Sequence, residues 1–386
     1  MNTKIYHPLI TENHNKLRSQ VREFALNEIK PIAQKLDENS EFSPELTKKM
    51  GKLGLFGITI PEEFGGKNLD TLSYIIAIEE LARIDSSQAA TIAAQNSLGI
   101  APIYKYGTNE QKQRLLPQLT SGENLWAFGL TEPNAGSDAK AIETSAILNN
   151  GHWIVNGQKV FITNSASELS MGVTILVNTS DDPNQKEFSA ILMEKELSKY
   201  KTESIKNKMV WRAADTGRLT FIDSVASKEN LLGERGRGMH IMLETLDSGR
   251  LSIAAIGLGL AQGAFDMARE HSLKRKQFGK SLSMFQSISN KLADMDIKLE
   301  LARNYLYYSC WLKDNNLPFT KQAAISKLYT SEIAKEIADE AVQIHGAYGL
   351  FKDHDIERFY RDQRILSIGE GTSEILKIVI AKHIDI

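Results

Sequence analysis

Several residue types are scarce in this chain, and each scarcity excludes or disfavours a class of protein. There is a single cysteine, Cys310, so no disulfide can form within the chain, as is usual in reducing compartments. Only 9 of the 386 residues are proline, which excludes a collagen-like or proline-rich disordered chain and favours long helices. No stretch approaches the ~18 consecutive apolar residues that span a bilayer, and the C-terminal run from Ile378 to Ala381 is far too short.

The chain also lacks an excess of charge of either sign. Its 46 basic and 48 acidic residues leave a formal charge of −2, which argues against nucleic acid or an anionic membrane as a partner. The segment from Met1 to Ile10 has neither an apolar signal core nor an Arg-rich transit pattern. We therefore expect a cytoplasmic protein, or a mitochondrial matrix protein if the chain is a processed form.

What the chain does contain is helical periodicity on both sides of a stretch with alternating periodicity. Amphipathic patterns fill the first part, alternation begins near Leu125, and helical stripes return after Gly238. The strongest stripe alternates spacings of four and three, as in a helix bundle, and a last helix is expected to begin near Thr372. The predicted fold is mainly α with an inserted β domain: an N-terminal helical domain (1–123), a middle β-barrel or sandwich domain (124–232) and a C-terminal four-helix bundle (233–386).

A β-hairpin is predicted at the start of the middle domain. His152 to Val155 and Lys159 to Thr163 alternate as strands do, and Asn156-Gly157 between them is a type I′ turn signal. Further strands are expected at 173–177, 188–193 and 219–222.

The common nucleotide and metal motifs are absent from the sequence. The glycines from Gly257 to Gly263 resemble a dinucleotide fingerprint, but the third is misplaced and no strand precedes the run, so close helix packing is the better interpretation. There is no P-loop, no His-Glu-x-x-His and no Gly-x-Ser-x-Gly. Asp353, His354 and Asp355 are interpreted as a solvated loop, and no metal site is predicted.

Three segments carry more chemical information. Residues 127–138 leave a strand and enter a loop dense in small and hydroxyl residues, where backbone N–H groups can approach an anionic or carbonyl-rich ring. Phe161 and Thr163 stand two residues apart on one strand face, which suits a planar heterocycle. Glu370 stands between two glycines just before the last helix, where a substrate can reach its carboxylate.

Together these segments resemble, in order and over nearly the whole chain, the acyl-CoA dehydrogenase family of flavoenzymes, especially its short-chain members. The resemblance extends to Leu246 to Arg250, Arg275 to Lys280, Phe285-Gln286 and Gln343 to Gly349. It implies the three-domain fold already described, a homotetramer and one FAD per subunit.

The resemblance also implies where the cofactor binds. The flavin ring is expected against two strand segments, and the remainder of FAD against residues contributed across a subunit boundary. Phe161 stands where most members have tryptophan, which reduces the stacking area. The expected FAD-binding residues are Phe128, Leu130, Thr131, Ser137, Phe161, Thr163, Arg275, Phe278, Gln286, Gln343, Gly346, Thr372 and Glu374.

By the same resemblance, Glu370 is the general base that removes the α-proton of an acyl thioester while the β-hydrogen leaves as hydride to the flavin. The base position of isovaleryl-type members falls at Gly249, which has no side chain. Ser137, Asp247 and Arg250 are expected at the pantetheine and the channel mouth, although a structural ion pair between Arg250 and Asp247 is the alternative. Gly369 and Gly371 flank the base, and Gly369, where straight-chain members have an aromatic residue, suggests room for a branched acyl group.

Two other interpretations remain open at this stage. The acyl group could be tethered to a carrier protein instead of CoA, or the chain could be a non-catalytic flavoprotein relative in DNA-damage response or complex assembly. The expected electron acceptor is electron-transfer flavoprotein. The sequence leaves open the acyl chain length, the branching, the acceptor and the metabolic pathway.

Overall fold

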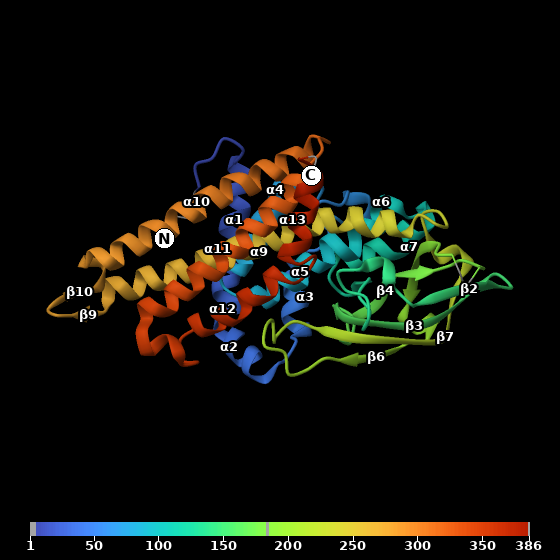
Figure 1. Cartoon of the computed structure of the whole chain (residues 1–386), viewed down its shortest axis with the longest axis horizontal. Coiled ribbons are helices and arrows are strands. Elements are labelled where there is room, and N and C mark those ends of the chain that lie inside the picture. The colour runs from blue at the N-terminus through green and yellow to red at the C-terminus, as the bar shows by residue number, and fades with distance from the viewer. Residues whose placement is uncertain (1–4, 183–184, 385–386) are drawn as a thin grey trace.

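A computed structural model describes residues 5–182 and 185–384 of the protein. Helices, then strands, then helices follow one another along the chain, with the sheet at one end of an elongated molecule and the long helices extending to the other (Figure 1). The prediction of a mainly α fold with an inserted β domain is confirmed.

The N-terminal part consists of short helices around one that is buried along its whole length. That helix is α4, in which every residue is buried, so it forms the centre of this part. Asp70 caps its first turn by accepting a hydrogen bond from the Ser73 backbone N–H at 2.8 Å. Two π-helical segments, Ala25–Ile29 and Gln95–Ile100, interrupt the series. The helices are α1 (Glu12–Phe24), α2 (Lys30–Asn39), α3 (Pro44–Lys52), α4 (Thr71–Ala82), α5 (Ser86–Ala94), α6 (Ala101–Tyr106) and α7 (Asn109–Thr120).

The middle part is a mixed sheet in which the strands follow the order β6-β7-β3-β2-β4-β5-β8. The first strand, β1, lies off this path and pairs in parallel with β4. A one-turn helix, α8 (Lys195–Ser198), follows β5. The strands are β1 (Leu125–Gly129), β2 (Ser145–Asn149), β3 (His152–Thr163), β4 (Ser170–Asn178), β5 (Phe188–Glu194), β6 (Lys201–Ser204), β7 (Thr216–Ser227) and β8 (Leu231–Leu232).

The predicted hairpin turn at Asn156-Gly157 is wrong, because β3 runs without interruption through both residues. The turn lies one Asn-Gly pair earlier, at Asn150 (φ 48°) and Gly151 (φ 80°), between the antiparallel strands β2 and β3. Gly157 instead marks a β-bulge against β7, where a Cβ would lie 2.4 Å from the Thr144 Oγ1. Both pairs fit the turn pattern, and the sequence alone did not separate them.

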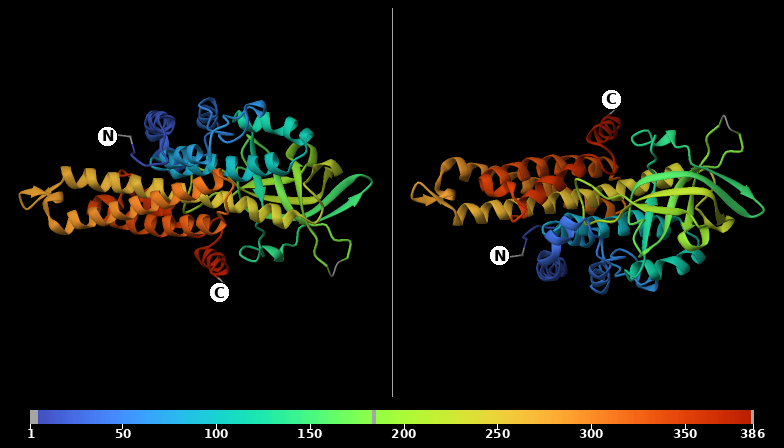
Figure 2. Two further views of the ribbon diagram at one scale, coloured as in Figure 1. Left: turned by 90° about the horizontal axis from the view of Figure 1, so that it is seen from above. Right: turned by 90° about the horizontal axis from the view of Figure 1, so that it is seen from below.

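The C-terminal part is a bundle built on α9 (Gly238–Lys274), α10 (Gln286–Asp314), α11 (Thr320–His345) and α13 (Ser373–Lys382). A short helix, α12 (Ile356–Asp362), and a two-stranded hairpin of β9 (Lys276–Gln277) and β10 (Lys280–Ser281) complete it. Viewed from above and below, α13 projects from the face opposite the N-terminal helices (Figure 2). Among the described residues, α9 is the helix long and apolar enough to cross a membrane, but 78% of its apolar window is buried inside the protein.

The glycine run in α9 is a packing feature, as the sequence suggested. A Cβ on Gly259 would lie 2.2 Å from the Glu79 backbone oxygen in α4, and one on Gly263 would lie 2.4 Å from the Arg83 backbone oxygen. These glycines therefore let α9 and the N-terminal helices approach more closely than any larger residue permits.

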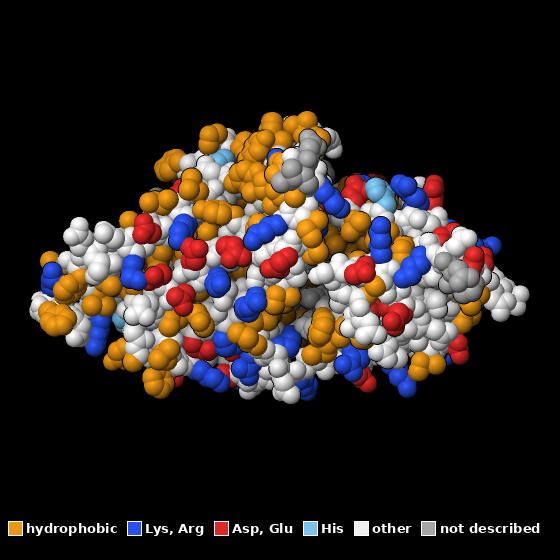
Figure 3. All heavy atoms as spheres, viewed as in Figure 1, with side chains coloured by type: hydrophobic (Ala, Val, Ile, Leu, Met, Phe, Trp, Pro, Cys, Tyr) orange, Lys and Arg blue, Asp and Glu red, His pale blue; other side chains and the backbone are white. Residues whose placement is uncertain are grey.

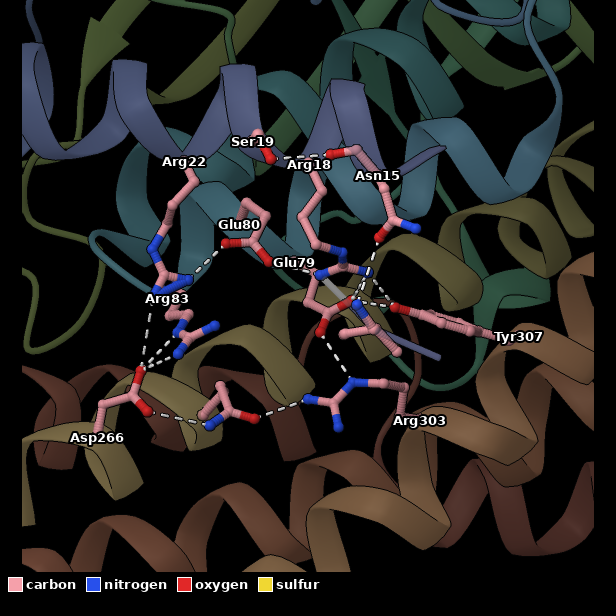
Figure 4. A network of polar contacts seen from close by, with 12 residues as sticks. Asn15, Arg18, Ser19, Arg22, Glu79, Glu80, Arg83, Asp266, Arg303 and Tyr307 are labelled. Carbon is pink, nitrogen blue, oxygen red and sulfur yellow. Dashed lines mark hydrogen bonds and ion pairs between the residues drawn. The ribbon is translucent and has the colours of Figure 1, made fainter. Parts of the chain in front are cut away.

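A buried ionic network joins the N-terminal helices to the bundle (Figure 4). From α1, Arg18 Nη2 lies 3.3 Å from Glu79 Oε2, and Arg22 Nη1 donates to Glu80 Oε2 at 2.7 Å. From α10, Arg303 Nε donates to Glu79 Oε1 at 3.1 Å and the Tyr307 hydroxyl donates to Glu79 Oε2 at 2.6 Å. The two carboxylates of α4 thus connect three elements that are far apart in the sequence.

Candidate active site

The loop before α13 has an unusual backbone. Glu370 has φ 53° and Gly371 has φ 103°, and Thr372 then caps α13 by accepting a hydrogen bond from the Ile375 N–H at 3.3 Å. A left-handed φ costs a non-glycine residue of the order of 1 kcal/mol and persists only where the surroundings impose it. Such strain is typical of functional positions.

The Glu370 carboxylate turns inward against α9. Its Oε2 is buried and has no hydrogen-bond partner among the described residues. A Cβ placed on Gly249 would lie 2.0 Å from this oxygen and 3.1 Å from the Leu98 Cδ2. The carboxylate therefore occupies the space that any side chain at position 249 would fill, and Leu98 of the π-helical segment borders the same space.

Burial and two cations together set the charge of this carboxyl. Burial raises the pKa of Glu370 to about 7, and the neighbouring cations Lys327 and Arg250 oppose the rise. Burial also lowers the pKa of Lys327 to about 8, against the influence of Glu370. A carboxyl with a pKa near neutrality can take up and release a proton under physiological conditions, as a general base must.

Arg250 is held in an ion pair. Its Nη1 donates to Asp247 Oδ1 at 2.6 Å, and Asp247 Oδ2 accepts a hydrogen bond from the Thr320 hydroxyl at 2.6 Å. Arg250 is buried and Asp247 half-buried. The structural ion pair considered from the sequence is present, and the Arg250 Nε is left without a partner among the described residues.

The structure places the two segments predicted for the flavin side by side. The Val160 N–H donates to the Thr131 oxygen at 3.0 Å, next to a buried ion pair in which Lys159 Nζ lies 2.7 Å from Glu132 Oε1. A bulge between Lys159 and Ile162 leaves Phe161 at φ 62° with 68% of its surface exposed. Phe128, Leu130, Thr131 and Thr163 are half-buried, and Ser137 is exposed in the following loop.

Another group of predicted residues lies far from this sheet. Arg275, Phe278 and Gln286 are exposed at the β9–β10 hairpin, and Phe278 is 93% exposed. α9 begins against β5 and leads directly into this hairpin, and its 37 residues span about 55 Å. Figure 1 shows the hairpin at the end of the molecule opposite the sheet. Gln343 and Gly346 end α11, where the Arg275 guanidinium lies over the Tyr348 ring at 5.4 Å.

A groove of about 810 Å³ runs between α11 and α13, on the outer side of the Glu370 loop. Thr372 and Glu374, both predicted from the sequence, line it. Its charged lining residues are of both signs: Lys335, Arg364 and Lys377 with Glu332 and Glu374.

Sequence reasoning missed Lys327 and Tyr74. Lys327 is fully buried and lies seven residues, two helical turns, before Ala334, which begins an apolar stripe of α11. A lysine in line with an apolar stripe was the available signal. Nothing in the sequence marks Tyr74, and the π-helical turn that brings Leu98 to this space follows from tertiary packing.

Comparison with known proteins gives matches along the whole chain. Family models for the N-terminal, middle and C-terminal domains of acyl-CoA dehydrogenase match residues 11–123, 127–224 and 236–384. The chain is 42% identical over 375 residues to the short-chain-specific acyl-CoA dehydrogenase of Clostridium acetobutylicum, covering 97% of this chain and 98% of that protein.

Solved structures agree closely with the fold. Butyryl-CoA dehydrogenase from Megasphaera elsdenii superposes with a TM-score of 0.94 and 36% identity, covering 99% of this chain and 100% of that one. A chain from a structure described as the electron transferring flavoprotein of Acidaminococcus fermentans gives a TM-score of 0.95 and 39% identity, with coverage of 98% and 100%.

Proposed function

The chain belongs to the acyl-CoA dehydrogenase family and is an oxidoreductase that dehydrogenates acyl-CoA thioesters with FAD, and on this premise we propose that Glu370 is its catalytic base. The observation that carries the proposal is the buried Oε2 of Glu370, which is aimed into the space beside Gly249 without a partner among the described residues. A pKa raised to about 7 makes this carboxylate a stronger base than an ordinary glutamate.

The residues present fit FAD. The exposed Phe161 ring and the adjoining segments supply a face for a planar ring, and three buried polar atoms at the end of β3 and in the loop before β7 have no partner among the described residues. These atoms are Asn164 Oδ1, Ser167 Oγ and Trp211 Nε1. We propose that Phe128, Leu130, Thr131, Phe161 and Thr163 hold the ring and that Thr372 and Glu374 contact the cofactor from the groove between α11 and α13.

FAD, when bound, accepts the β-hydrogen of the acyl group as hydride. Glu370 removes the α-proton at its carboxylate, and the product is the 2,3-enoyl thioester. No described residue accepts a hydrogen bond from the Glu370 backbone N–H, which is therefore free to polarise the thioester carbonyl. Ser137, Asp247 and Arg250 are proposed to contact the pantetheine and the channel mouth, with Gly369 and Gly371 leaving room beside the reacting carbons.

The preferred substrate is proposed to be a short acyl-CoA. Similarity to a short-chain-specific enzyme and to a butyryl-CoA dehydrogenase supports the chain length. The three atoms nearest to a Cβ on Gly369 would all belong to Ile365, at 3.6 Å or more, so the missing side chain leaves space that a branched acyl group can use.

Anaerobic titration tests this proposal. We expect butyryl-CoA to bleach the flavin absorbance of the purified enzyme, isobutyryl-CoA to do so to a smaller extent, and octanoyl-CoA to fail. Glu370→Gln should bind FAD and butyryl-CoA without bleaching. A variant that bleaches at the wild-type rate would reject Glu370 as the base, and bleaching only by an acyl group on a carrier protein would reject CoA thioesters as the substrates.

We further propose a homotetramer in which subunits share cofactor sites. One chain cannot bring its hairpin and its sheet to the same FAD, since α9 separates them by about 55 Å. An apolar stripe on the outer face of α10 is uncovered in one chain: Ile297, Leu301, Tyr308 and Trp311 are 40–59% exposed. Figure 3 shows hydrophobic side chains gathered near the C-terminus, on the face that α10 crosses. Leu301→Glu should produce smaller species in sedimentation experiments, and an unchanged mass would argue against this contact.

Electron-transfer flavoprotein is proposed as the acceptor, and the cytoplasm, or the mitochondrial matrix for a processed form, as the location. The similarity to a chain from the Acidaminococcus fermentans structure supports the acceptor. Reduction of purified electron-transfer flavoprotein by enzyme and butyryl-CoA, compared with reduction of oxygen, tests it directly.

A further inference from the structure

The loop that carries Glu370 is held by three side chains of α11. Lys327 Nζ donates to the Gly371 oxygen at 2.6 Å, and the Ser331 hydroxyl donates to the Leu366 oxygen at 2.9 Å. Glu332 Oε1 accepts a hydrogen bond from the Ser373 hydroxyl at 3.1 Å. Lys327 and Ser331, four residues apart, lie on one face of α11, and Glu332 follows Ser331 directly, so these three contacts hold the segment on both sides of Glu370.

Lys327 differs from the other two because it brings a charge into the interior. Its side chain is fully buried, and its ammonium group donates to the neutral Gly371 carbonyl. Among the described residues, no carboxylate lies within ion-pair distance of Lys327. A buried cation without a paired carboxylate carries a large desolvation penalty. A hydroxyl could make the same structural contact to a carbonyl without this penalty, and Ser331 makes such a contact to Leu366.

We propose that Lys327 is a positioning residue for the base: its ammonium group fixes the carbonyl of Gly371, and with it the left-handed backbone of Glu370, and its charge favours the ionised carboxylate. This inference rests on the proposed role of Glu370. The consequence is a base that can be buried deeply and still be deprotonated near neutral pH.

The other groups around this pair do not replace that charge. The carboxyl of Glu370 is influenced by Lys327 from α11 and by Arg250 from α9, and Tyr74 of α4 lies near enough to respond to it. Arg250 is already paired with Asp247 at 2.6 Å. Lys327 itself is influenced by Arg250 and, more weakly, by Glu332 and Glu374. It is therefore the cation near the base whose charge no ion pair neutralises.

The pH dependence of kcat/KM for butyryl-CoA tests the proposal on the holoenzyme. Lys327→Gln keeps a hydrogen-bond donor but removes the charge, and Lys327→Met removes both. Loss of a nearby cation disfavours the ionised carboxylate of Glu370 and so raises its pKa. In both variants we therefore expect the acidic limb of the kcat/KM profile to move upward by about one pH unit. Lys327→Met should also lower the plateau value of kcat, because the loop loses its anchor. Ser331→Ala is the matched control: it removes a neutral hydrogen bond from the same face and should leave the limb in place.

A second readout needs no substrate. Glu370→Gln is made in the wild type and in Lys327→Gln, and the change that it causes in the free energy of unfolding is measured as a function of pH. This pH dependence reports the ionisation of the Glu370 carboxyl in the folded protein. We expect its midpoint to rise in Lys327→Gln. The proposal would be overturned if the midpoint and the acidic limb of Lys327→Gln coincided with those of the wild type. It would also be overturned if Ser331→Ala shifted the acidic limb as much as Lys327→Gln does. Failure of the wild type to oxidise any acyl-CoA would instead reject the proposed function, and the unfolding readout would still decide the role of Lys327.

Discussion

At the scale of single residues, the Glu370 carboxylate is a functional group kept at a cost to stability. Its pKa is raised by burial from 4.5 to about 7, so the folded protein binds this proton more tightly than the unfolded chain does. The stability that the proton contributes is fully present below pH ~4.5 and is lost as the pH rises through about 7.

Glu370→Gln removes that pH-dependent loss. We expect the variant to be more stable than the wild type at pH 8 by up to ~3 kcal/mol and equally stable at about pH 4.5. Urea unfolding at fixed protein and FAD concentration measures both values. Equal stability at both pH values would mean that water reaches the carboxylate in the folded protein.

The sequence was informative about which residue carries the chemistry and less so about how it is presented. Glu370 between two glycines, read with the family resemblance, was sufficient to propose it as the base. Its left-handed backbone and its fit against Gly249 depend on α9 and α11, which approach from positions ~120 and ~40 residues away. Lys327 was missed although its position in line with the apolar stripe of α11 indicated burial, because its contact with the Gly371 oxygen depends on how α11 packs against this loop.

At the scale of elements, periodicity predicted the helices of the bundle but not the local chemistry that joins them to other elements. The stripes of α10 and α11 contain mainly buried residues, as expected. The hairpin turn was misplaced, because two Asn-Gly pairs satisfy the same rule. The ionic network of Figure 4 could not be predicted from the sequence, since its charges come from the four separated helices α1, α4, α9 and α10.

That network gives a prediction about how α1 is attached. Burial alone would raise the pKa of Glu79, but Arg18 and Arg303 lower it to about 2, so its contribution to stability is present above pH ~4.5 and is lost as the pH falls through about 2. Arg18→Met removes the buried cation that lies beside both Glu79 and Glu80 and should cost about 3 kcal/mol or more in urea unfolding at pH 7.

The control for this variant is an exposed ion pair. Arg218 lies 3.8 Å from Glu203 at the surface, and Arg218→Met should change stability by less than ~0.5 kcal/mol. A loss in Arg18→Met as small as in this control would show that the buried network contributes nothing to the attachment of α1.

At the scale of the whole molecule, the predicted cofactor residues fall into two groups that one chain cannot bring together. The segments proposed to bind the flavin ring and Glu370 belong to the sheet and the middle of the bundle, whereas Arg275 and Phe278 lie at the far hairpin (Figure 1). The sequence indicated this division through resemblance alone, because no pattern of residues states how far apart two segments will lie. The structure gives this division a physical basis, because about 55 Å of α9 separates the two groups of residues.

Mixed oligomers test this division directly. Glu370→Gln lacks the base, and Arg275→Glu should weaken FAD binding, so each variant alone is expected to be nearly inactive. If a site takes Glu370 from one chain and Arg275 from its partner, each hybrid dimer contains one site with both residues intact. Random reassembly of equal amounts makes half of the dimers hybrid and should restore about a quarter of wild-type butyryl-CoA dehydrogenation. If the mixture stays as inactive as the separate variants, both residues serve the same site within one chain, and the shared cofactor site is rejected.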